Sequence, residues 1–572
     1  MAWRTKQVRR SGSKDIDPDE IFLDDKNIPE YDVHQFEGRI DAPIGRRMIV
    51  SLSCAFIVIA LIMLTRALNL EVWQGKDFAA KSEANRLEHQ LLFPERGVIT
   101  DRNGVHLAWN YPGDDNLGFS LRGYTETPGF GGLLGYLHYP ARDSHGIFYR
   151  NDYEADVGIE AFYNEQLKGK SGLRIIETDA LGHVMSSNTI DPPTPGADLK
   201  LTIDSKLQSL LYKQIGKFAE QEDYLGGAGA MMDIDTGEVL ALVSYPDFDP
   251  NVMTAATDTA TIAEYNKDKG SPFLNRVIGG LFTPGSIVKP IFALGALTEG
   301  IIGAETPVST HGYITVPNKY FPDKPSRFND WRDQGTLDMR SALAWSSDVY
   351  FYEIAGGFEG QKGLGIKNVE KYARMFGFGT STGLDLYGEV GGTIPNPEWK
   401  ARTFPNDPNW RIGDTYFTGI GQYGMQISVM QALREAGIIA SNGKVVQPHL
   451  NSSVASSSYQ LPIKKSDFIV AQEGMRKVVT DGTATLLNVP VTKVAAKTGT
   501  AELGVTKVRV NSWVIGFFPY DKPKYAFAIV MDRGVKGNTT NAAYVAQKVF
   551  WAMASTTPEY LKGETTDVTA ER

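Results

Sequence analysis

The stretch PGSIVKPIFALGALTEG, residues 284–300, says most about the fold and chemistry of this chain. Apolar residues recur in it at helical spacing after a Pro-Gly pair, and Gly300 supplies a stop, so we expect a helix that begins at Ser286. The first turn of a helix presents unpaired N–H groups and the positive end of the helix dipole. Both stabilise the oxyanion that forms when a serine attacks a carbonyl group. The stretch therefore predicts a nucleophilic serine at a helix N-terminus.

Lys289 follows Ser286 by one helical turn and is expected on the same face of that helix. A lysine ordinarily titrates near ~10.4, so it must be buried or placed beside another cation before it accepts a proton at neutral pH. Lys497 is the expected neighbouring cation. The sequence thus predicts a serine–lysine unit in which Lys289 is the base.

Ser346-Ser347-Asp348 comes next along the chain, between two apolar helical segments. A loop there would turn Ser346 toward Lys289, where its hydroxyl relays a proton to the leaving amine. Asp348 is expected to line the substrate site. A Ser-x-Asp that merely caps a helix is the alternative interpretation.

Lys497-Thr498-Gly499 follows an apolar strand, which we expect at the edge of a sheet, where it can pair with a peptide substrate. Gly499 would let a substrate backbone lie close. The hydroxyls of Thr498 and Thr500, beside the Lys497 ammonium, would hold a carboxylate, and the Thr500 N–H would complete an oxyanion hole.

Single matches to such short motifs arise by chance. Ser11-Gly12-Ser13-Lys14 and Ser186-Ser187-Asn188 also fit the first and second patterns. The former lies in a polar tail and the latter precedes the nucleophile, so both are interpreted as noise. The order of the three motifs and their expected local structures are what favour a catalytic site.

Residues 48–65, MIVSLSCAFIVIALIMLT, form an uncharged run between Arg47 and Arg66. The run is long enough to cross a bilayer as one helix. A buried core helix is disfavoured because all faces are apolar, and a cleaved signal peptide because a long mixed-charge segment precedes the run. We expect an uncleaved signal anchor. Basic residues on both sides leave its orientation open.

Five parts are expected along the chain: a flexible cytoplasmic tail (1–45), the transmembrane anchor (46–69), a β-rich pedestal domain (70–195), a larger domain (196–556) and a flexible C-terminal tail (557–572). In the pedestal, Asn103-Gly104 is a strong hairpin signal. In the larger domain, strands within 229–245 and 512–530 flank a helix-rich middle. This pattern predicts an α+β fold with a mainly antiparallel sheet flanked by helices.

Composition excludes several classes of function. The net charge is −9 and no basic stripe is evident, so nucleic-acid binding is not expected. Cys54 is the only cysteine, so neither an intrachain disulfide nor a thiolate-rich zinc site is possible.

The three motifs in this order resemble the signature of β-lactamases and penicillin-binding proteins. Residues 94–104 and Gly158-Ile159-Glu160 resemble two non-catalytic segments of class B penicillin-binding proteins. Asp348 in place of Asn and the stretch 376–400 look most like the penicillin-binding protein 2 subfamily of cell elongation, with division-specific class B transpeptidases as the nearest rival. The resemblance implies a penicilloyl-serine transferase (β-lactamase-like) domain after a pedestal or dimerisation-type domain.

What the resemblance implies is a peptidoglycan D,D-transpeptidase, with residual carboxypeptidase activity. Ser286 would attack the penultimate D-alanine of a stem peptide on nascent, lipid-linked glycan, and a neighbouring amine would take the acyl group. β-Lactam antibiotics would acylate the same serine. Lys289 would be the base, Ser346 the relay, and Lys497, Thr498 and Thr500 the carboxylate anchors.

The family also implies a place and partners. The protein would lie in the bacterial cytoplasmic (inner) membrane as a single-pass protein, with the N-terminus cytoplasmic and the catalytic domain outside. A SEDS-family glycosyltransferase and other elongation-complex proteins would be its partners.

Two departures from the family pattern stand out. The usual Gly-Gln-Gly segment reads Gly421-Gln422-Tyr423-Gly424 here and is expected to alter a loop without touching the catalytic groups. The cysteine that holds a metal near the second motif in some relatives is missing. We therefore expect no metal and no cofactor.

Three other classes share part of the pattern. A β-lactamase-like hydrolase would need a way to activate water and would leave the anchor and pedestal unexplained. A β-lactam sensor would need a cytoplasmic signalling domain. A mainly non-catalytic activator of a partner glycosyltransferase would not need Ser286, Lys289 and Lys497 intact.

Overall fold

The computed structural model describes residues 45–78, 87–113, 117–144, 148–178, 183–318, 321–537 and 541–562. The chain divides into two compact units, one made of residues 1–88 and 177–185 and the other of residues 89–176 and 186–572. The predicted cytoplasmic tail lies almost entirely outside the described residues.

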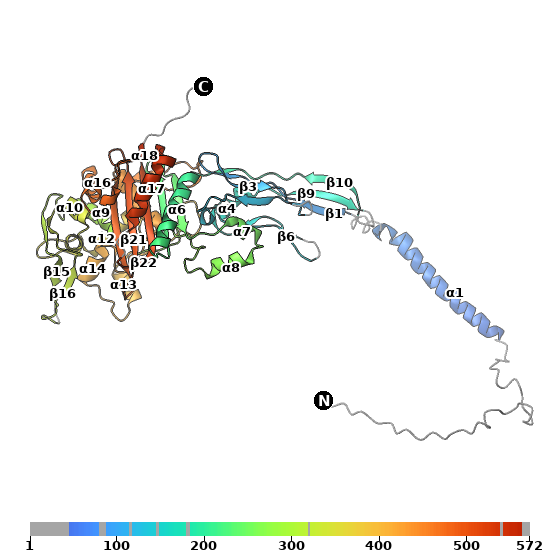
Figure 1. The fold of residues 1–572 in the computed structure, drawn as a ribbon. Coiled ribbons are helices and arrows are strands. Elements are labelled where there is room, and N and C mark those ends of the chain that lie inside the picture. The colour runs from blue at the N-terminus through green and yellow to red at the C-terminus, as the bar shows by residue number, and fades with distance from the viewer. Residues whose placement is uncertain are drawn as a thin grey trace, which may run out of the picture. The chain divides into compact units, whose positions relative to one another are not determined.

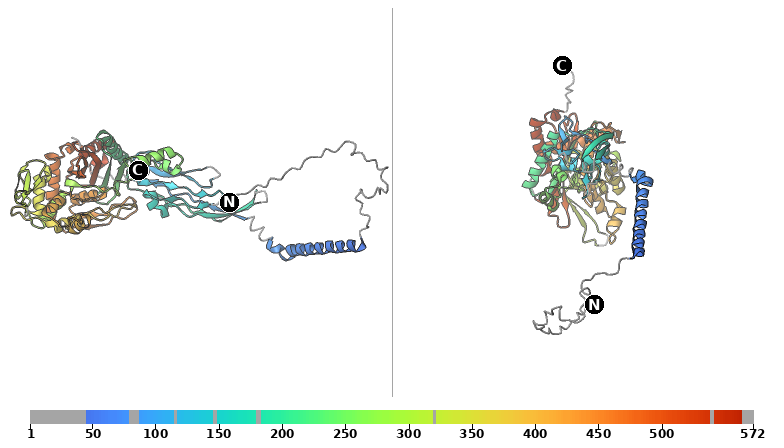
Figure 2. Two further views of the ribbon diagram at one scale, coloured as in Figure 1. Left: turned by 90° about the horizontal axis from the view of Figure 1, so that it is seen from below. Right: turned by 90° about the vertical axis from the view of Figure 1, so that its right-hand side faces the viewer.

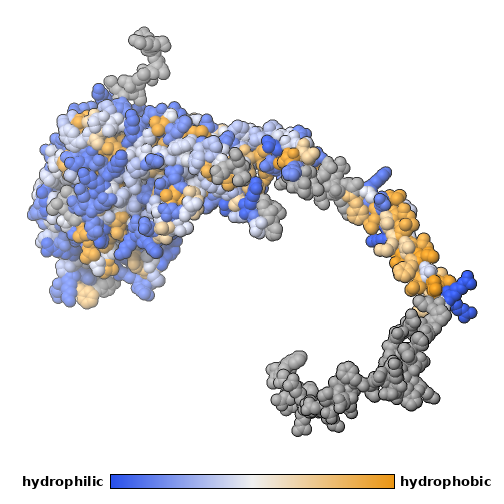
Figure 3. All heavy atoms as spheres, turned by 45° about the vertical axis from the view of Figure 1, so that its right-hand side comes forward, coloured by the Kyte–Doolittle hydropathy of each residue, from blue (hydrophilic) through white to orange (hydrophobic). Residues whose placement is uncertain are grey.

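The first unit contains the helix α1 (Arg46–Leu68), which continues through a π-helical turn at Asn69–Trp73. The helix is continuous in both views of Figure 2, and its surface is hydrophobic almost throughout in Figure 3. Together these 28 residues form a helix long and apolar enough to cross a membrane. The predicted apolar span is thus helical, and its side chains are exposed, as lipid-facing side chains would be.

A five-stranded antiparallel sheet, of which Figure 1 labels β21 and β22, organises the larger domain. Its strand order is β13-β12-β22-β21-β20. Its strands are β12 (Gly226–Asp233), β13 (Val239–Tyr245), β20 (Ala495–Leu503), β21 (Arg509–Phe518) and β22 (Tyr525–Val535). The strands predicted within 229–245 and 512–530 are confirmed, as is the antiparallel pairing. β20, which carries Lys497-Thr498-Gly499, is an edge strand as predicted.

The two faces of the sheet bury different cores, because side chains alternate along each strand. On β21, Trp513 and Ile515 belong to one core, whereas Val514 and Phe518 belong to the other. Helices α6 (Ser205–Gln221) and α17 (Ala542–Thr556) pack together over the second face (Figure 1). α15 (Val429–Ala440) packs against the first face.

The larger domain contains further helices and strands. The helices are α7 (Pro250–Ala255), α8 (Thr259–Lys267), the 3₁₀ turn η5 (Gly285–Val288), α9 (Lys289–Thr298), α10 (Met339–Trp345), α11 (Asp348–Gly356), α12 (Gly365–Met375), α13 (Pro397–Thr403), α14 (Ile412–Gly419), α16 (Lys465–Thr480), the 3₁₀ turn η6 (Thr485–Leu487) and α18 (Glu559–Lys562). The strands are β14 (Val308–Thr310), β15 (Tyr313–Val316), β16 (Ser326–Asn329), β17 (Gly335–Leu337), β18 (Lys444–Val446) and β19 (Ser458–Gln460).

The pedestal is built mainly of strands, as predicted. They are β1 (Leu87–Leu92), β2 (Ile99–Thr100), β3 (His106–Tyr111), β4 (Leu121–Tyr124), β5 (Leu137–His138), β6 (Ala141–Arg142), β7 (Phe148–Arg150), β8 (Glu154–Ala155), β9 (Gly172–Thr178), β10 (Val184–Asp191) and β11 (Leu199–Lys200), with helices α3 (Gly131–Leu134), α4 (Gly158–Phe162) and α5 (Asn164–Leu167). β2 and β3 pair across the predicted Asn103-Gly104 turn, where Gly104 has φ 83°.

A buried ion cluster holds the pedestal together. Glu160, fully buried, accepts hydrogen bonds from Arg96 Nε at 2.7 Å and Arg122 Nε at 2.8 Å. Burial opposes ionisation of the carboxyl, yet Arg122 and Arg96 together hold the pKa of Glu160 below its usual value. Removing one partner would leave a buried charge uncompensated, so the segments 94–104 and 158–160 are structurally coupled.

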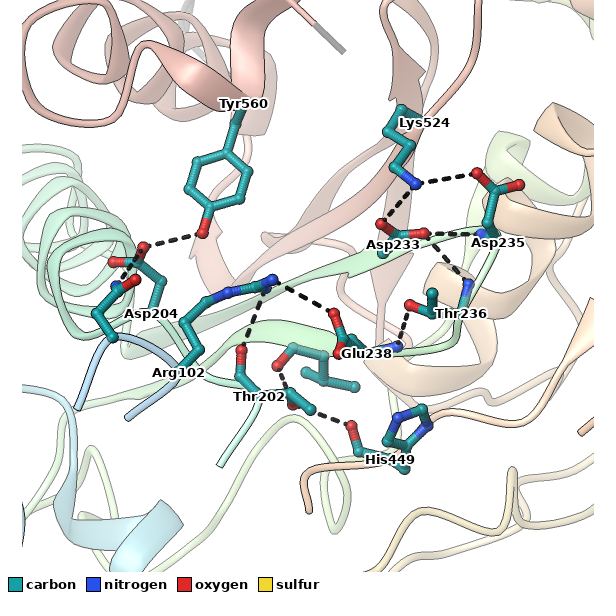
Figure 4. A network of polar contacts seen from close by, with 12 residues as sticks. Arg102, Thr202, Asp204, Asp233, Asp235, Thr236, Glu238, His449, Lys524 and Tyr560 are labelled. Atoms are coloured by element: carbon teal, nitrogen blue, oxygen red, sulfur yellow. Dashed lines mark hydrogen bonds and ion pairs between the residues drawn. The ribbon is translucent and has the colours of Figure 1, made fainter. Parts of the chain in front are cut away.

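Polar contacts tie the β2–β3 turn to the larger domain (Figure 4). Arg102 reaches Glu238 Oε2 at 3.4 Å, and Asn103 Nδ2 donates to Asp204 Oδ2 at 3.2 Å. The same Asp204 oxygen accepts from the Tyr560 hydroxyl at 2.9 Å. One carboxylate therefore joins the pedestal, α6 and the C-terminal segment.

The C-terminal segment corrects one expectation. Residues 557–572 were expected to form a flexible tail, but α18 follows α17 directly, and Tyr560 and Leu561 on it are buried. These two side chains complete the core under α17. The polar residues around them in the sequence conceal this buried role. Residues 563–572 lie outside the described residues.

The aromatic cluster under α17 provides a test of this core. Phe550, 2% exposed, lies edge-on to Phe518 and Phe527, with ring centroids 4.9 and 5.5 Å away. We expect Phe550→Ala to lower the free energy of unfolding of this domain by about 3–5 kcal/mol because it leaves a cavity. Chemical denaturation measures this change. Trp551→Ala is the matched control. Trp551, the next residue on α17, is 47% exposed, so its replacement should change the free energy of unfolding by less than about 1 kcal/mol. An equal loss in both variants would contradict the packing described.

Candidate active site

Ser286 lies in η5, directly before α9, so the predicted position at a helix N-terminus is confirmed. Gly285 before it has φ 60°, a conformation that favours glycine. Ser286 opens into a pocket of about 340 Å³. The pocket is lined by Ser286, Trp331, Ser346, Asp348, Thr483, Thr498, Gly499, Thr500, Trp513 and Asn541. All three sequence motifs therefore meet at one pocket.

The second motif lies between α10 and α11, on a loop as predicted. Ser346 has φ 58°, which ends α10 and turns its side chain toward the lysines. Ser347 caps α11, since its hydroxyl accepts from the Tyr350 N–H at 3.2 Å. The motif thus contains both the cap of the alternative interpretation and a serine that faces the pocket.

Lys289 is fully buried and bound to the second motif. Its Nζ donates to the Ser346 carbonyl at 2.7 Å and to Asp348 Oδ1 at 2.7 Å, and lies 3.3 Å from Ser346 Oγ. No hydrogen bond between Ser286 Oγ and Lys289 Nζ is present among the described contacts. In this state Lys289 therefore bridges to Ser346 instead of contacting the serine one turn before it.

Lys497 reaches the same hydroxyl from the opposite side. It is fully buried, and its Nζ donates to Ser346 Oγ at 2.8 Å and to the Thr498 carbonyl at 3.0 Å. Burial lowers the pKa of Lys497 well below its usual value, and the Lys289 ammonium lowers it further. Two lysines thus share one hydroxyl.

The position of Lys497 changes the picture of carboxylate binding. Among the described residues that line the pocket, neither lysine appears, whereas Thr498 and Thr500 both do. Thr498 Oγ1 lies 2.6 Å from Thr483 Oγ1, a residue that the sequence did not single out. A bound carboxylate would meet threonine hydroxyls, with the Lys497 side chain behind them.

Gly499 lines the pocket and also has a packing role that the sequence did not predict. A Cβ atom at Gly499 would stand 2.7 Å from the Pro284 carbonyl oxygen and 3.0 Å from Ile287 Cγ2. The absence of a side chain therefore lets the loop that carries Ser286 pack against β20.

The Gly421–Gly424 segment lies nearer to the nucleophile than expected. The Gly285 N–H donates to the Gly421 carbonyl at 2.9 Å, and a Cβ atom at Gly421 would stand 2.2 Å from the Gly285 carbonyl oxygen. This segment thus supports the residue that precedes Ser286. Tyr423, the inserted residue, packs on Trp399 and Trp410, away from that contact.

Asp330 is a site residue that the sequence analysis missed. Its Oδ2 accepts from Ser347 Oγ at 2.6 Å and from the Val349 N–H at 3.1 Å, so it holds both sides of the second motif. The next residue, Trp331, is 55% exposed and forms one wall of the pocket. No periodic pattern marks this loop, and only the structure brings it to the motif.

One of the two chance matches to the motifs lies in the described part of the chain, and as expected it does not line the pocket. Ser186, Ser187 and Asn188 are exposed on β10 of the pedestal. The copy at residues 11–14 lies outside the described residues.

Two family models match the chain. The penicillin-binding protein transpeptidase domain matches residues 227–552, and the penicillin-binding protein dimerisation domain matches residues 120–201. Curated relatives include the peptidoglycan D,D-transpeptidase MrdA of Acinetobacter baumannii, 29% identical over 92% of this chain and 89% of that protein. MrdA of Salmonella typhimurium is 30% identical over 72% of this chain and 68% of that protein.

Solved structures agree with these matches. PBP2 of Pseudomonas aeruginosa, in complex with WCK 5153, is 30% identical with a TM-score of 0.66, covering 81% of this chain and 96% of that one. PBP2 of Helicobacter pylori, in complex with MreC, is 26% identical with a TM-score of 0.68, covering 82% and 99%. The transpeptidase model matches more than half of the chain. The chain therefore belongs to the class B penicillin-binding proteins and is a homologue of the MrdA (PBP2) transpeptidases.

Proposed function

We propose that this protein is a peptidoglycan D,D-transpeptidase of cell-wall elongation that works through an acyl-enzyme on Ser286. The observation that carries the proposal is the convergence of Lys289 and Lys497 on Ser346 Oγ, beside a pocket into which Ser286 opens. The MrdA relatives support the elongation role over the division role of FtsI, whose Buchnera aphidicola homologue is 24% identical.

The first step forms an ester. Ser286 Oγ attacks the carbonyl carbon of the penultimate D-alanine, and Lys289 accepts the hydroxyl proton. The peptide bond to the terminal D-alanine then breaks, and its nitrogen takes a proton delivered through Ser346 Oγ. The lysine–serine–lysine contacts described above supply a continuous path for that proton.

The helix N-terminus and the edge strand bind the substrate. N–H groups at Ser286 and Thr500 stabilise the oxyanion, and Thr498 and Thr500 hydroxyls hold the terminal carboxylate. Asp348, which lines the pocket, accepts from donors of the stem peptide while it holds Lys289. The stem peptide extends along β20 as an added strand.

The second step transfers the acyl group to an amine of a neighbouring stem peptide, with the proton path reversed. Water in place of that amine gives residual carboxypeptidase activity, and a β-lactam in place of the stem peptide gives a stable acyl-enzyme. Slow reaction of this ester with water distinguishes the proposed enzyme from a β-lactamase.

For the whole protein we propose a single-pass topology, with the N-terminus in the cytoplasm and the catalytic domain outside, where stem peptides are found. The relatives suggest the partners. One similar structure is a complex of PBP2 with MreC, and another concerns a peptidoglycan synthase complex that couples polymerization and crosslinking. We propose that this chain likewise works with elongation-complex proteins and a SEDS-family glycosyltransferase, which it activates in addition to its own catalysis.

The nucleophile can be tested by intact-mass analysis of the full chain in detergent with benzylpenicillin. We expect one stable adduct on the wild type and none on Ser286→Ala, because only Ser286 carries the attacking oxygen. Ser466→Ala, an exposed serine on α16, is the control and should be acylated like the wild type. Rapid drug loss without an adduct would indicate a hydrolase instead.

The role of Asp330 can be tested by acylation kinetics. Asp330→Ala removes the acceptor that fixes Ser347 and Val349, so we expect acylation by benzylpenicillin to slow by about 10–100-fold as the second motif shifts. Asp333→Ala, in the same loop, removes only an acceptor for the Gly335 N–H and should leave the rate within about twofold. Equal acylation rates for Asp330→Ala and the wild type would show that the second motif keeps its position without Asp330.

Topology can be tested with a single cysteine. Val505, in the turn after β20, is 100% exposed. In a Cys54→Ala background we expect Val505→Cys to react with a membrane-impermeant maleimide in spheroplasts. Arg10→Cys should react only after lysis. The opposite pattern would overturn the proposed orientation.

A further inference from the structure

A second pocket lies beside α11, and it shares no lining residue with the pocket at Ser286. Its volume is about 510 Å³. Val308, Ile314 and Phe358 give it some apolar walls, and Glu353, Glu359 and His311 give it titratable groups. The other lining residues, among them Ser309, Thr315 and Gln361, are mostly polar. Nothing in the proposed transpeptidase mechanism uses these residues.

Glu353 is the unusual group in this pocket. It lies on α11, is only 8% exposed, and its carboxylate has no hydrogen bond or ion pair with any described residue. Burial raises the pKa of Glu353 to about 7, and the nearby Glu359 contributes to the rise. Glu353 thus faces the pocket without a protein counter-ion, and its charge would stabilise a cation bound there.

The lining favours an organic cation over a metal ion. Among the described residues, no three His, Cys, Asp or Glu side chains gather closely enough to hold a metal. The apolar walls, by contrast, suit the methylene stem of an amine or guanidinium, whose charged end would meet Glu353 and Glu359.

We propose that this pocket binds an organic cation, a primary ammonium or guanidinium group on an aliphatic stem, with Glu353 as its buried counter-ion. The charge has two possible sources, a free small amine or a lysine or arginine side chain of a protein. Both present the same chemistry to Glu353.

Ligand-observed ¹⁹F NMR on the full chain in detergent tests the proposal. The probes are the trifluoroethylamides of N-acetyl-lysine, N-acetyl-arginine and N-acetyl-norleucine, the last being the uncharged match. We expect the two cationic probes to bind and norleucine to bind at least tenfold more weakly. Glu353→Gln should weaken the cationic probes at least tenfold, and Glu359→Gln should weaken them several-fold.

Glu264→Gln is the matched control, because Glu264 is an exposed glutamate on α8, and it should leave binding unchanged. Acylation of Ser286 by benzylpenicillin reports that each variant is folded. Cadaverine that displaces the lysine probe supports a free amine, whereas displacement only by N-acetyl-lysine methylamide supports a protein side chain.

The pH dependence gives a second readout. Binding should weaken at least fivefold from pH 7.5 to pH 5.5, since Glu353 takes up a proton as the pH falls through its pKa. Protonation of Glu359 or His311 would also weaken binding of the cation. The hydroxyls of Tyr350 and Tyr416 stay neutral, because burial above all, with a contribution from Glu353, raises their pKa values.

Equal binding of the lysine and norleucine probes, or wild-type binding by Glu353→Gln, would overturn the proposal. Binding of Mg²⁺ or Zn²⁺ alone that Glu353→Gln abolishes, without binding of either cationic probe, would replace the organic cation by a metal.

Discussion

The site depends on two buried lysine side chains that meet at one serine hydroxyl. Two ammonium groups cannot both stay charged cheaply in a buried space, and Asp348 is the one carboxylate that bonds to either of them among the described contacts. Asp348 binds Lys289, whereas burial and, after it, Lys289 lower the pKa of Lys497. Ser346 Oγ lies between the two amines and is therefore placed to pass a proton on to the substrate. The chemistry we propose for Ser286 depends on this arrangement.

The fold brings these groups together from three distant places in the sequence. Ser286 comes from η5 and Lys289 from the first residue of α9, Ser346 from the turn between α10 and α11, and Lys497 from the edge strand β20. Gly499 lets the serine loop lie against that strand, and Gly421 closes on Gly285 from the other side. Small residues thus set the distances, while the two cores of the sheet keep β20 and the helices from moving apart.

Sequence patterns predicted what local chemistry determines. The apolar strands β21 and β22, the Asn103-Gly104 turn and the helical turn at Ser286 each follow from a few neighbouring residues, and all three are confirmed. The loop of Asp330 and Trp331 was missed because its role depends on a contact with Ser347 that no spacing encodes. The packing of Pro284 against Gly499 was not predicted because it is a tertiary contact. α18 was missed because only two buried side chains define it.

Two buried carboxylates of this molecule, Glu160 and Glu435, differ in whether they have hydrogen-bond partners. In the pedestal, Glu160 is fully satisfied by Arg96 and Arg122, as befits a part that only has to stay rigid. Near the site, Glu435 on α15 is fully buried with both oxygens unpaired, and burial raises its pKa well above the usual range against the pull of Lys497. An ionised Glu435 raises the pKa of Lys497 and so opposes the effect of burial on that lysine. Protonation of Glu435 removes this opposition.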